Sequence, residues 1–229
     1  MYIFNRLAGF SEVKLKSKKI PPVTMARSRY PRPSNEELLA TLNSSNVIGF
    51  LIARNPYERL ISAYRDKIIG AFRNSLHDKL NKKIVVKYRH ILPKNYRHGV
   101  TVPTFKEFVS YILDESHAGH ELDMHWTPAY SFCNPCQVNL THIIKFETFD
   151  RDTEAILELV KLKHLLPRTG KLDQNKSKDS KQTSSALIDM YLNELTPNLL
   201  NGLLQLYGVD FDIFNYDRKE NFEFRPTKI

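Results

Sequence analysis

The sequence predicts an α/β fold in which helices cover a parallel sheet. Two segments have the length and apolar character of strands, VIGFLIA (47–53) and HIIKFETF (142–149), and amphipathic helix patterns follow each of them. Strands that alternate with helices are typical of α/β layer folds. The uninterrupted apolar run 47–53 indicates a parallel strand covered on both faces. Because 229 residues with 41% hydrophobic residues can bury one core, we expect a single domain over residues 1–229.

A helix is predicted directly after the first strand. Asn55 is a favourable N-cap, Pro56 suits the first helical position, and Glu58 completes a capping-box pattern. The expected buried stripe consists of Leu60, Tyr64, Ile68 and Phe72, with Ile61 and Ile69 beside it. Arg54 therefore stands at the carboxyl end of a strand and before a helix N-terminus, where anions bind favourably. The alternative is that Arg54 pairs with a neighbouring carboxylate such as Glu58.

Further helices follow from capping and periodicity. Thr104 and Glu107 form a capping box ahead of FKEFVSYIL, whose apolar face consists of Phe105, Phe108, Val109, Ile112 and Leu113. After the second strand, a helix is expected from about Asp152 to Leu166, with acids in its first turn and basic residues in its last.

The C-terminal part predicts two more helices. One starts at Ser184 or Ser185, and the next has Thr196 as N-cap, Pro197 at its first position and Gly208 at its end. The polar, lysine-rich stretch 168–185 is expected to be a loop.

The charge is strongly basic and unevenly spread. The net charge is +9, and residues 79–98 contain seven Lys or Arg and no acid. Such runs are either solvated surface or a field that attracts a polyanion, which could be nucleic acid, anionic lipid or an acidic glycan. The sequence contains no apolar stretch of the length that spans a membrane and no signal-peptide pattern.

One stretch reads R-N-P-x5-S-A-Y and consists of Arg54, Asn55, Pro56, Ser62, Ala63 and Tyr64. It resembles the 3′-phosphate-binding motif of sulfotransferases. These enzymes use 3′-phosphoadenosine-5′-phosphosulfate as sulfate donor. The longer form RNPYERLISAYRDK is most similar to the Golgi carbohydrate sulfotransferases that act on chondroitin, dermatan and related glycans. The resemblance implies that Arg54 and Ser62 contact the 3′-phosphate. Many members have Asp where this chain has Asn55, and both residues cap helices.

Two further blocks support the resemblance. LDMHWTPAYSFCNPCQVNLTHIIKFET (122–148) is similar to the family's D-x-H-W, C-x-P-C and K-F-E segments, and LYGVDFDIFNY (206–216) is similar to its usual close. The resemblance implies a P-loop-like sulfotransferase fold with a central parallel sheet. It also implies transfer to a hydroxyl of a glycan of glycosaminoglycan or N-glycan type, with an acidic glycan as acceptor, and a type II membrane protein of the Golgi lumen in the full-length form. We expect no metal and no nucleic-acid partner.

The reaction needs a base, because the attacking sugar hydroxyl must lose a proton. His125 is the first candidate, since a neutral imidazole suits this task near pH 7, and Glu147 and Asp123 are the others. The alternative is that His125 is a structural residue beside Trp126. The resemblance does not select the base. The basic residues Lys82, Lys83 and Lys87 are the candidates for binding the acceptor.

The two cysteines, Cys133 and Cys136, allow more than one interpretation. They could form half of a zinc site with His125 and His142, although no second paired motif follows at finger spacing. In an enzyme of the secretory pathway, a disulfide or a thiol that seeks a partner is the other interpretation.

The printed sequence has no match to the phosphosulfate loop that follows the first strand of sulfotransferases. MYIFNRLAG (1–9) resembles the helix after that loop, so we expect an N-terminally incomplete fold whose anchor, first strand and loop lie upstream. We therefore expect residues 1–229 as written to lack useful activity. The competing hypothesis is a non-catalytic binder of acidic glycan or nucleic acid, for which no nucleic-acid-binding module is recognisable.

Overall fold

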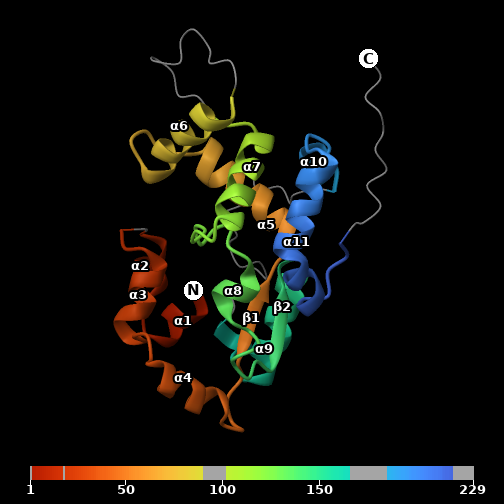
Figure 1. Cartoon of the computed structure of the whole chain (residues 1–229). Helices are drawn as coiled ribbons and strands as arrows, with labels where there is room; N and C mark the ends of the chain where they lie inside the picture. The colour runs from red at the N-terminus through yellow and green to blue at the C-terminus, as the bar shows by residue number, and fades with distance from the viewer. Residues whose placement is uncertain (1, 18, 90–101, 166–184, 219–229) are drawn as a thin grey trace. The chain divides into compact units, whose positions relative to one another are not determined.

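The computed structural model describes residues 2–17, 19–89, 102–165 and 185–218, and the chain divides into two compact units. The first unit combines Met1–Ile52 with Pro135–Lys176, and the second combines Ala53–Asn134 with Ser177–Ile229. Figure 1 labels their helices and strands. The single sulfotransferase domain expected from the sequence stays a prediction.

The first unit opens with short helices. These are α1 (Tyr2–Leu7), α2 (Glu12–Lys16), α3 (Pro22–Arg29) and α4 (Asn35–Leu42). The side-chain amide of buried Asn5 on α1 donates to the carbonyl of Pro22 at 3.0 Å, which ties α1 to the start of α3. Ser34 and Glu37 form a capping box, and this local signal starts α4.

The described residues contain a two-stranded parallel sheet of β1 (Phe50–Ala53) and β2 (His142–Lys145). After β2 the chain continues through the 3₁₀ turn η2 (Phe146–Thr148), α9 (Phe149–Leu159) and the 3₁₀ turn η3 (Lys163–Leu165). Gly49 leads into β1 at a crowded point: a Cβ there would lie 2.7 Å from Leu42 Cδ2, and the Gly49 carbonyl accepts the N–H of Thr141 at 2.9 Å. A side chain at this position would push the two strands' leading segments apart.

The expectation that 47–53 is covered on both faces is wrong for the residues described. Phe50 and Ile52 are 36% and 47% exposed, whereas Ala53 is buried. Successive side chains of a strand point to opposite faces. The apolar run of β1 therefore has one covered and one open face among the described residues.

The second unit is mainly helical. Its elements are α5 (Pro56–Ala63), the π-helical turn η1 (Tyr64–Ile69), α6 (Leu76–Tyr88), α7 (Phe105–His117), α8 (Ala129–Cys133), α10 (Ser185–Leu192) and α11 (Pro197–Ile213). No helix in the described part of either unit combines the length and the apolar content that crossing a bilayer requires.

The core of the second unit is built around α7, which packs against α6 and α11 (Figure 1). The predicted capping box of Thr104 and Glu107 is present. All five residues of the predicted apolar face are buried: Phe105, Phe108, Val109, Ile112 and Leu113. Gly202 of α11 lies against Leu113, where a Cβ would come within 2.6 Å of Leu113 Cδ1. This close approach brings α11 onto α7.

The stripe predicted for the helix after β1 is correct in its first half. Leu60, Ile61, Tyr64 and Ile68 are buried, but Ile69 is 49% exposed and Phe72 is 86% exposed. The backbone changes to π-helical hydrogen bonding at Tyr64, and the helical segment ends before Gly70. Because the wider turn changes the residues per turn, the 3.6-residue periodicity no longer predicts which side chain faces inward.

Two other predicted boundaries are wrong. The helix expected from Asp152 to Leu166 is α9, which ends at Leu159, because Lys161 has a left-handed backbone with φ of 58°. The helix capped by Thr196 does not stop at Gly208. It continues to Ile213, and the burial of Tyr207, Asp210 and Phe211 holds its last turns in place.

Candidate functional site

Arg54 lies at the junction between β1 and α5, as predicted. The next residue, Asn55, caps α5: its side-chain oxygen accepts the backbone N–H of Tyr57 at 3.0 Å and of Glu58 at 3.3 Å. These two N–H groups are therefore already bonded within the protein. An anion at this junction would have to be recognised mainly by side chains.

The Arg54 side chain forms an ion pair along the flank of α5. Its Nε lies 3.5 Å from Glu58 Oε2, and the two side chains are 21% and 17% exposed. The carboxylate pairing considered as the alternative for Arg54 is thus present. Ser62 lies on the same helix, part-buried, about 10 Å along the axis from the cap.

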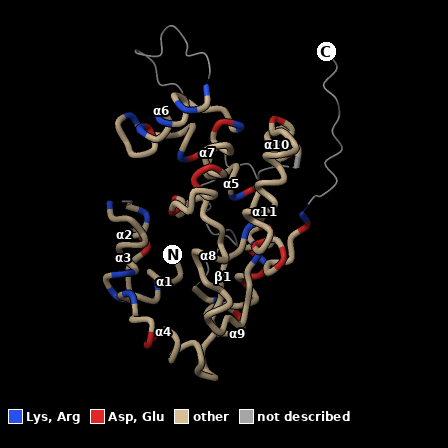
Figure 2. The backbone as a smooth tube through the Cα atoms, viewed as in Figure 1, with Lys and Arg blue, Asp and Glu red and all other residues tan. Residues whose placement is uncertain are grey.

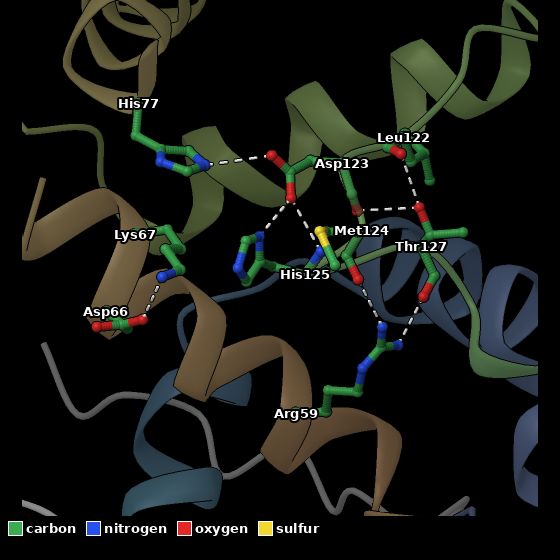
Figure 3. Close-up of polar contacts among 9 residues, drawn as sticks. All are labelled: Arg59, Asp66, Lys67, His77, Leu122, Asp123, Met124, His125 and Thr127. Carbon is green, nitrogen blue, oxygen red and sulfur yellow. Dashed lines mark hydrogen bonds and ion pairs between the residues drawn. The ribbon is translucent and has the colours of Figure 1, made fainter. Parts of the chain in front are cut away.

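A second group of polar side chains surrounds Asp123 (Figure 3). Asp123 Oδ1 lies 2.6 Å from His125 Nδ1 and accepts the backbone N–H of His125 at 2.9 Å. Asp123 Oδ2 lies 3.2 Å from Nε2 of His77, the second residue of α6. The three side chains are between 23% and 36% exposed, so solvent reaches them. The structure brings two of the predicted base candidates together and adds His77.

The hydrogen bonds at Asp123 influence its protonation. Partial burial raises the pKa of the Asp123 carboxyl, but the backbone N–H of His125 and the two imidazoles outweigh burial and hold that pKa below its usual value. A depressed pKa means that the ionised form stabilises the fold above the unfolded pKa, and that this contribution is lost as the pH falls through the folded pKa. Near neutral pH, Asp123 is therefore an ionised acceptor.

The segment that carries Asp123 and His125 is held by a buttress of three side chains, which we define as Arg59, Tyr207 and Asp210. Arg59 donates from Nη1 to the carbonyl of Thr127 at 2.6 Å and from Nη2 to that of Met124 at 3.0 Å (Figure 3). The Tyr207 hydroxyl donates to the carbonyl of Trp126 at 2.6 Å. Each of these carbonyls lies within four residues of Asp123.

Asp210 completes the buttress from α11. Its oxygens accept the backbone N–H groups of Ala129 at 2.6 Å and Tyr130 at 2.7 Å, at the start of α8. Burial raises the pKa of the Asp210 carboxyl, although both N–H groups and nearby Arg59 act in the opposite direction. Because the folded pKa is raised, the stability that Asp210 contributes is lost as the pH rises through that pKa. Its two hydrogen bonds tie the start of α8 to α11.

The other predicted residues lie elsewhere. Glu147 lies in η2 of the first unit, whereas Asp123 and His125 belong to the second. The lysines assigned to the acceptor are on α6, and each pairs with an acid: Lys82 with Asp78 at 3.1 Å, Lys83 with Glu115 at 3.9 Å and Lys87 with Asp114 at 3.0 Å. Figure 2 shows blue and red segments side by side along this part of the chain. The rest of the basic run, 90–98, lies outside the described residues.

Neither cysteine forms part of a metal cluster among the residues described. Both thiols are free, Cys133 part-buried and Cys136 exposed, and burial raises the pKa of the Cys133 thiol. The described group with three potential ligand atoms close together is His77, Asp123 and His125, whose atoms lie within 4.8 Å of one another. The zinc site considered for the cysteines with His125 and His142 is therefore not supported.

Sequence reasoning missed His77 and Arg59. His77 is 46 residues from Asp123, and Arg59 is 68 residues from Thr127, so no local pattern connects them. Arg59 falls within the recognised stretch RNPYERLISAYRDK, whose arginines other than Arg54 carried no assignment. The motif thus contained Arg59, but the carbonyls of Met124 and Thr127 that Arg59 binds could be identified only from the structure.

Comparison with known proteins gives a consistent result. Residues 1–217 match the Sulfotransferase family. Carbohydrate sulfotransferase 11 of Danio rerio is 31% identical over 221 residues, which cover 87% of this chain and 60% of that protein. Carbohydrate sulfotransferase 11 of Mus musculus is 28% identical with the same coverage, and carbohydrate sulfotransferase 9 of Homo sapiens is 32% identical over 72% of this chain and 37% of its own length. The chain thus spans about 60% of the length of the first relatives. No solved structure matches.

We predict that Arg59→Met loosens the segment around His125. Methionine fills a similar volume but leaves the carbonyls of Met124 and Thr127 without their charged donor, so the free energy of unfolding should fall by about 2 kcal/mol. Chemical denaturation measures this loss, and Arg73→Met at an exposed position is the control. Equal stability of both variants would show that the Arg59 contacts do not hold the segment.

Proposed function

The chain belongs to the sulfotransferase family, and from this premise we propose that it forms part of a carbohydrate sulfotransferase. The reaction is transfer of a sulfuryl group from 3′-phosphoadenosine-5′-phosphosulfate to a hydroxyl of a glycan. The observation that carries the proposal is the short contact between Asp123 and His125 in a chain similar to carbohydrate sulfotransferases. A P-loop-like fold, a Golgi location and a type II membrane anchor belong to the same proposal.

His125 is the proposed general base. Because ionised Asp123 can only accept, the 2.6 Å contact requires a proton on His125 Nδ1, which leaves the lone pair on Nε2. In the transfer, His125 Nε2 takes the proton of the glycan hydroxyl while the hydroxyl oxygen forms its bond to sulfur. The bond from sulfur to the 5′-phosphate oxygen breaks, and its electron pair stays on the phosphate. Asp123 then stabilises the imidazolium that forms.

Arg54 and Ser62 are the proposed contacts of the nucleotide's 3′-phosphate. A guanidinium offers five N–H donors, so an arginine that pairs with Glu58 through Nε can also face a phosphate. The donor supplies the sulfuryl group and a phosphate leaving group. The residues described here would orient its nucleotide end along the flank of α5.

The acceptor is proposed to be an acidic glycan that binds along α6 through Lys82, Lys83 and Lys87. Their partners Asp78, Glu115 and Asp114 do not forbid this role. Asp78 is buried and Glu115 is largely buried, but the three lysine side chains are 47–61% exposed, so a polyanion can compete for their ammonium groups. The alternative of a non-catalytic polyanion binder has no specific observation in its favour.

We predict that His125→Ala lowers kcat by about 10²–10⁴-fold and leaves the Kd of adenosine 3′,5′-bisphosphate unchanged, because only the proton-accepting group is removed. Steady-state kinetics and calorimetry measure the two effects, and these and the other kinetic tests use the protein extended by the phosphosulfate loop that is expected upstream. His120→Ala, which removes an exposed histidine paired with Glu115, is the control. Turnover near normal in His125→Ala would exclude His125 as base and leave Glu147 or Asp123.

We predict that Arg54→Ala weakens binding of adenosine 3′,5′-bisphosphate by at least about tenfold, since a charge-assisted hydrogen bond contributes about 1.5–3 kcal/mol. Glu58→Gln separates this role from the ion pair: it removes the competing carboxylate and should leave nucleotide affinity equal or higher. Arg73→Ala is the arginine control. An unchanged Kd in a folded Arg54→Ala protein would contradict the assignment.

We predict that replacing Lys82, Lys83 and Lys87 with Gln raises the acceptor KM several-fold and flattens its salt dependence, with little effect on the donor KM. The matched control replaces the exposed Lys14, Lys16 and Lys19, which removes the same charge elsewhere. If both triple variants behave alike, the effect is one of net charge and α6 is not the acceptor site.

A further inference from the structure

We infer that His77 is a positioning residue that acts on His125 through Asp123. This inference rests on the proposed function, because it gives His77 a task in the same proton transfer. Asp123 bridges the two imidazoles: Oδ1 faces His125 Nδ1 at 2.6 Å and Oδ2 faces His77 Nε2 at 3.2 Å (Figure 3). Each oxygen of one carboxylate thus has its own histidine.

The bridge determines which nitrogens carry protons. An ionised carboxylate only accepts hydrogen bonds, so His77 must present Nε2–H to Asp123 and His125 must present Nδ1–H. Rotation of the Asp123 carboxylate about its Cβ–Cγ bond moves both oxygens, so it must break the contacts of Oδ1 with the His125 ring and backbone N–H and also the contact of Oδ2 with His77. His77 therefore adds a second anchor to the orientation in which Oδ1 faces the His125 ring.

His77 is itself held in place by its surroundings. Ser75 caps α6 by accepting the N–H of Asp78 at 3.1 Å, which fixes the first turn that carries His77. The His77 ring makes a T-shaped contact with buried Trp126, with centroids 5.9 Å apart, and its centroid lies 5.8 Å from that of His125. A ring packed in this way keeps its donor aimed at Asp123.

Charged and titratable groups on the neighbouring elements are few. Lys67 of η1 lies beside the cluster and pairs with Asp66 at 2.8 Å (Figure 3). On α6, Asp78 pairs with Lys82. On α7, burial raises the pKa of Tyr111 most, and the charges of Glu115 and then Asp123 raise it further. Among the charged groups that the structure describes, Asp123 is the one that both imidazoles contact at hydrogen-bonding distance.

Loss of His77 should therefore weaken His125 as a base while the His125 side chain stays in place. If Asp123 turns away more easily, its negative charge gives less support to the imidazolium that forms on His125 during the transfer. The base then has less affinity for the proton it must take, so kcat falls and the acidic limb of its pH profile moves to lower pH. A residue with a purely structural role would not move that limb.

The test compares His77→Leu with His77→Gln, because the glutamine amide restores an N–H donor near the position of Nε2 and leucine does not. His77→Leu should lower kcat by about tenfold, move the acidic limb to lower pH and leave the nucleotide Kd unchanged. His77→Gln should keep most of the kcat of the unmodified protein and should leave the acidic limb close to its original pH. Near-normal kinetics in His77→Leu, an unmoved limb, or equal defects in the two variants would overturn the inference.

A readout without turnover separates this inference from the proposed function. Imidazole ¹⁵N chemical shifts should identify His125 as the Nδ1–H tautomer in the unmodified protein and in His77→Gln, and as a mixture in His77→Leu. That result can hold even if His125→Ala retains activity, in which case the positioning stands and the base assignment fails. Identical His125 tautomers in all three proteins would overturn the positioning role.

The same three side chains also offer a donor set that Zn²⁺ accepts, two imidazoles and a carboxylate. The hydrogen-bonded bridge requires protons on the two nitrogens that a metal would displace, so the inference predicts that chelation leaves activity unchanged. Activity that is lost on dialysis against a chelator and regained with Zn²⁺ would identify a metal site and overturn the bridge.

Discussion

The candidate site depends on pairing the backbone polar groups of an irregular segment. Residues 122–128 form no regular helix or strand that would pair their carbonyls. A buried carbonyl without a hydrogen bond destabilises the fold, so side chains must supply the donors. Arg59 pairs two carbonyls, Tyr207 pairs the carbonyl of Trp126, and the Thr127 hydroxyl lies within hydrogen-bonding distance of those of Leu122 and Asp123. His125 is therefore carried on a loop that is held from several sides.

The buttress joins two chemical tasks. Arg59 lies on α5, between Arg54 and Ser62, which are proposed to bind the nucleotide, and its guanidinium holds the segment that bears the proposed base. A displacement of α5 would therefore shift the segment that carries His125, because Arg59 links the two by hydrogen bonds. Positioning of this kind matters because a reaction loses rate steeply when the reacting groups are displaced by about 1 Å.

Local features of the fold were predictable because their determinants lie within a few residues. The caps at Asn55, Thr104 and Thr196 are present, and the apolar face of α7 is correct in all positions. Two of the failures have a common origin. The π-helical turn that leaves Phe72 exposed and the continuation of α11 past Gly208 are decided by tertiary packing, which outweighs local propensity. The family resemblance marked the block that contains His125 and Asp123 without selecting the base, and the bridge to His77 could be found only in the structure.

Neither unit is continuous in the chain, and this has a consequence for how the protein is made. The contacts of the second unit span long separations: Tyr207 and Trp126 are 81 residues apart, as are Asp210 and Ala129. A ribosome must therefore release α11 before the segment with His125 can reach its final environment, and the emerging chain must keep its apolar helices apart until then. Contacts of high sequence separation fold slowly. Maturation of the site is thus a late event after synthesis, and chaperone supply during that interval would affect the yield of competent protein.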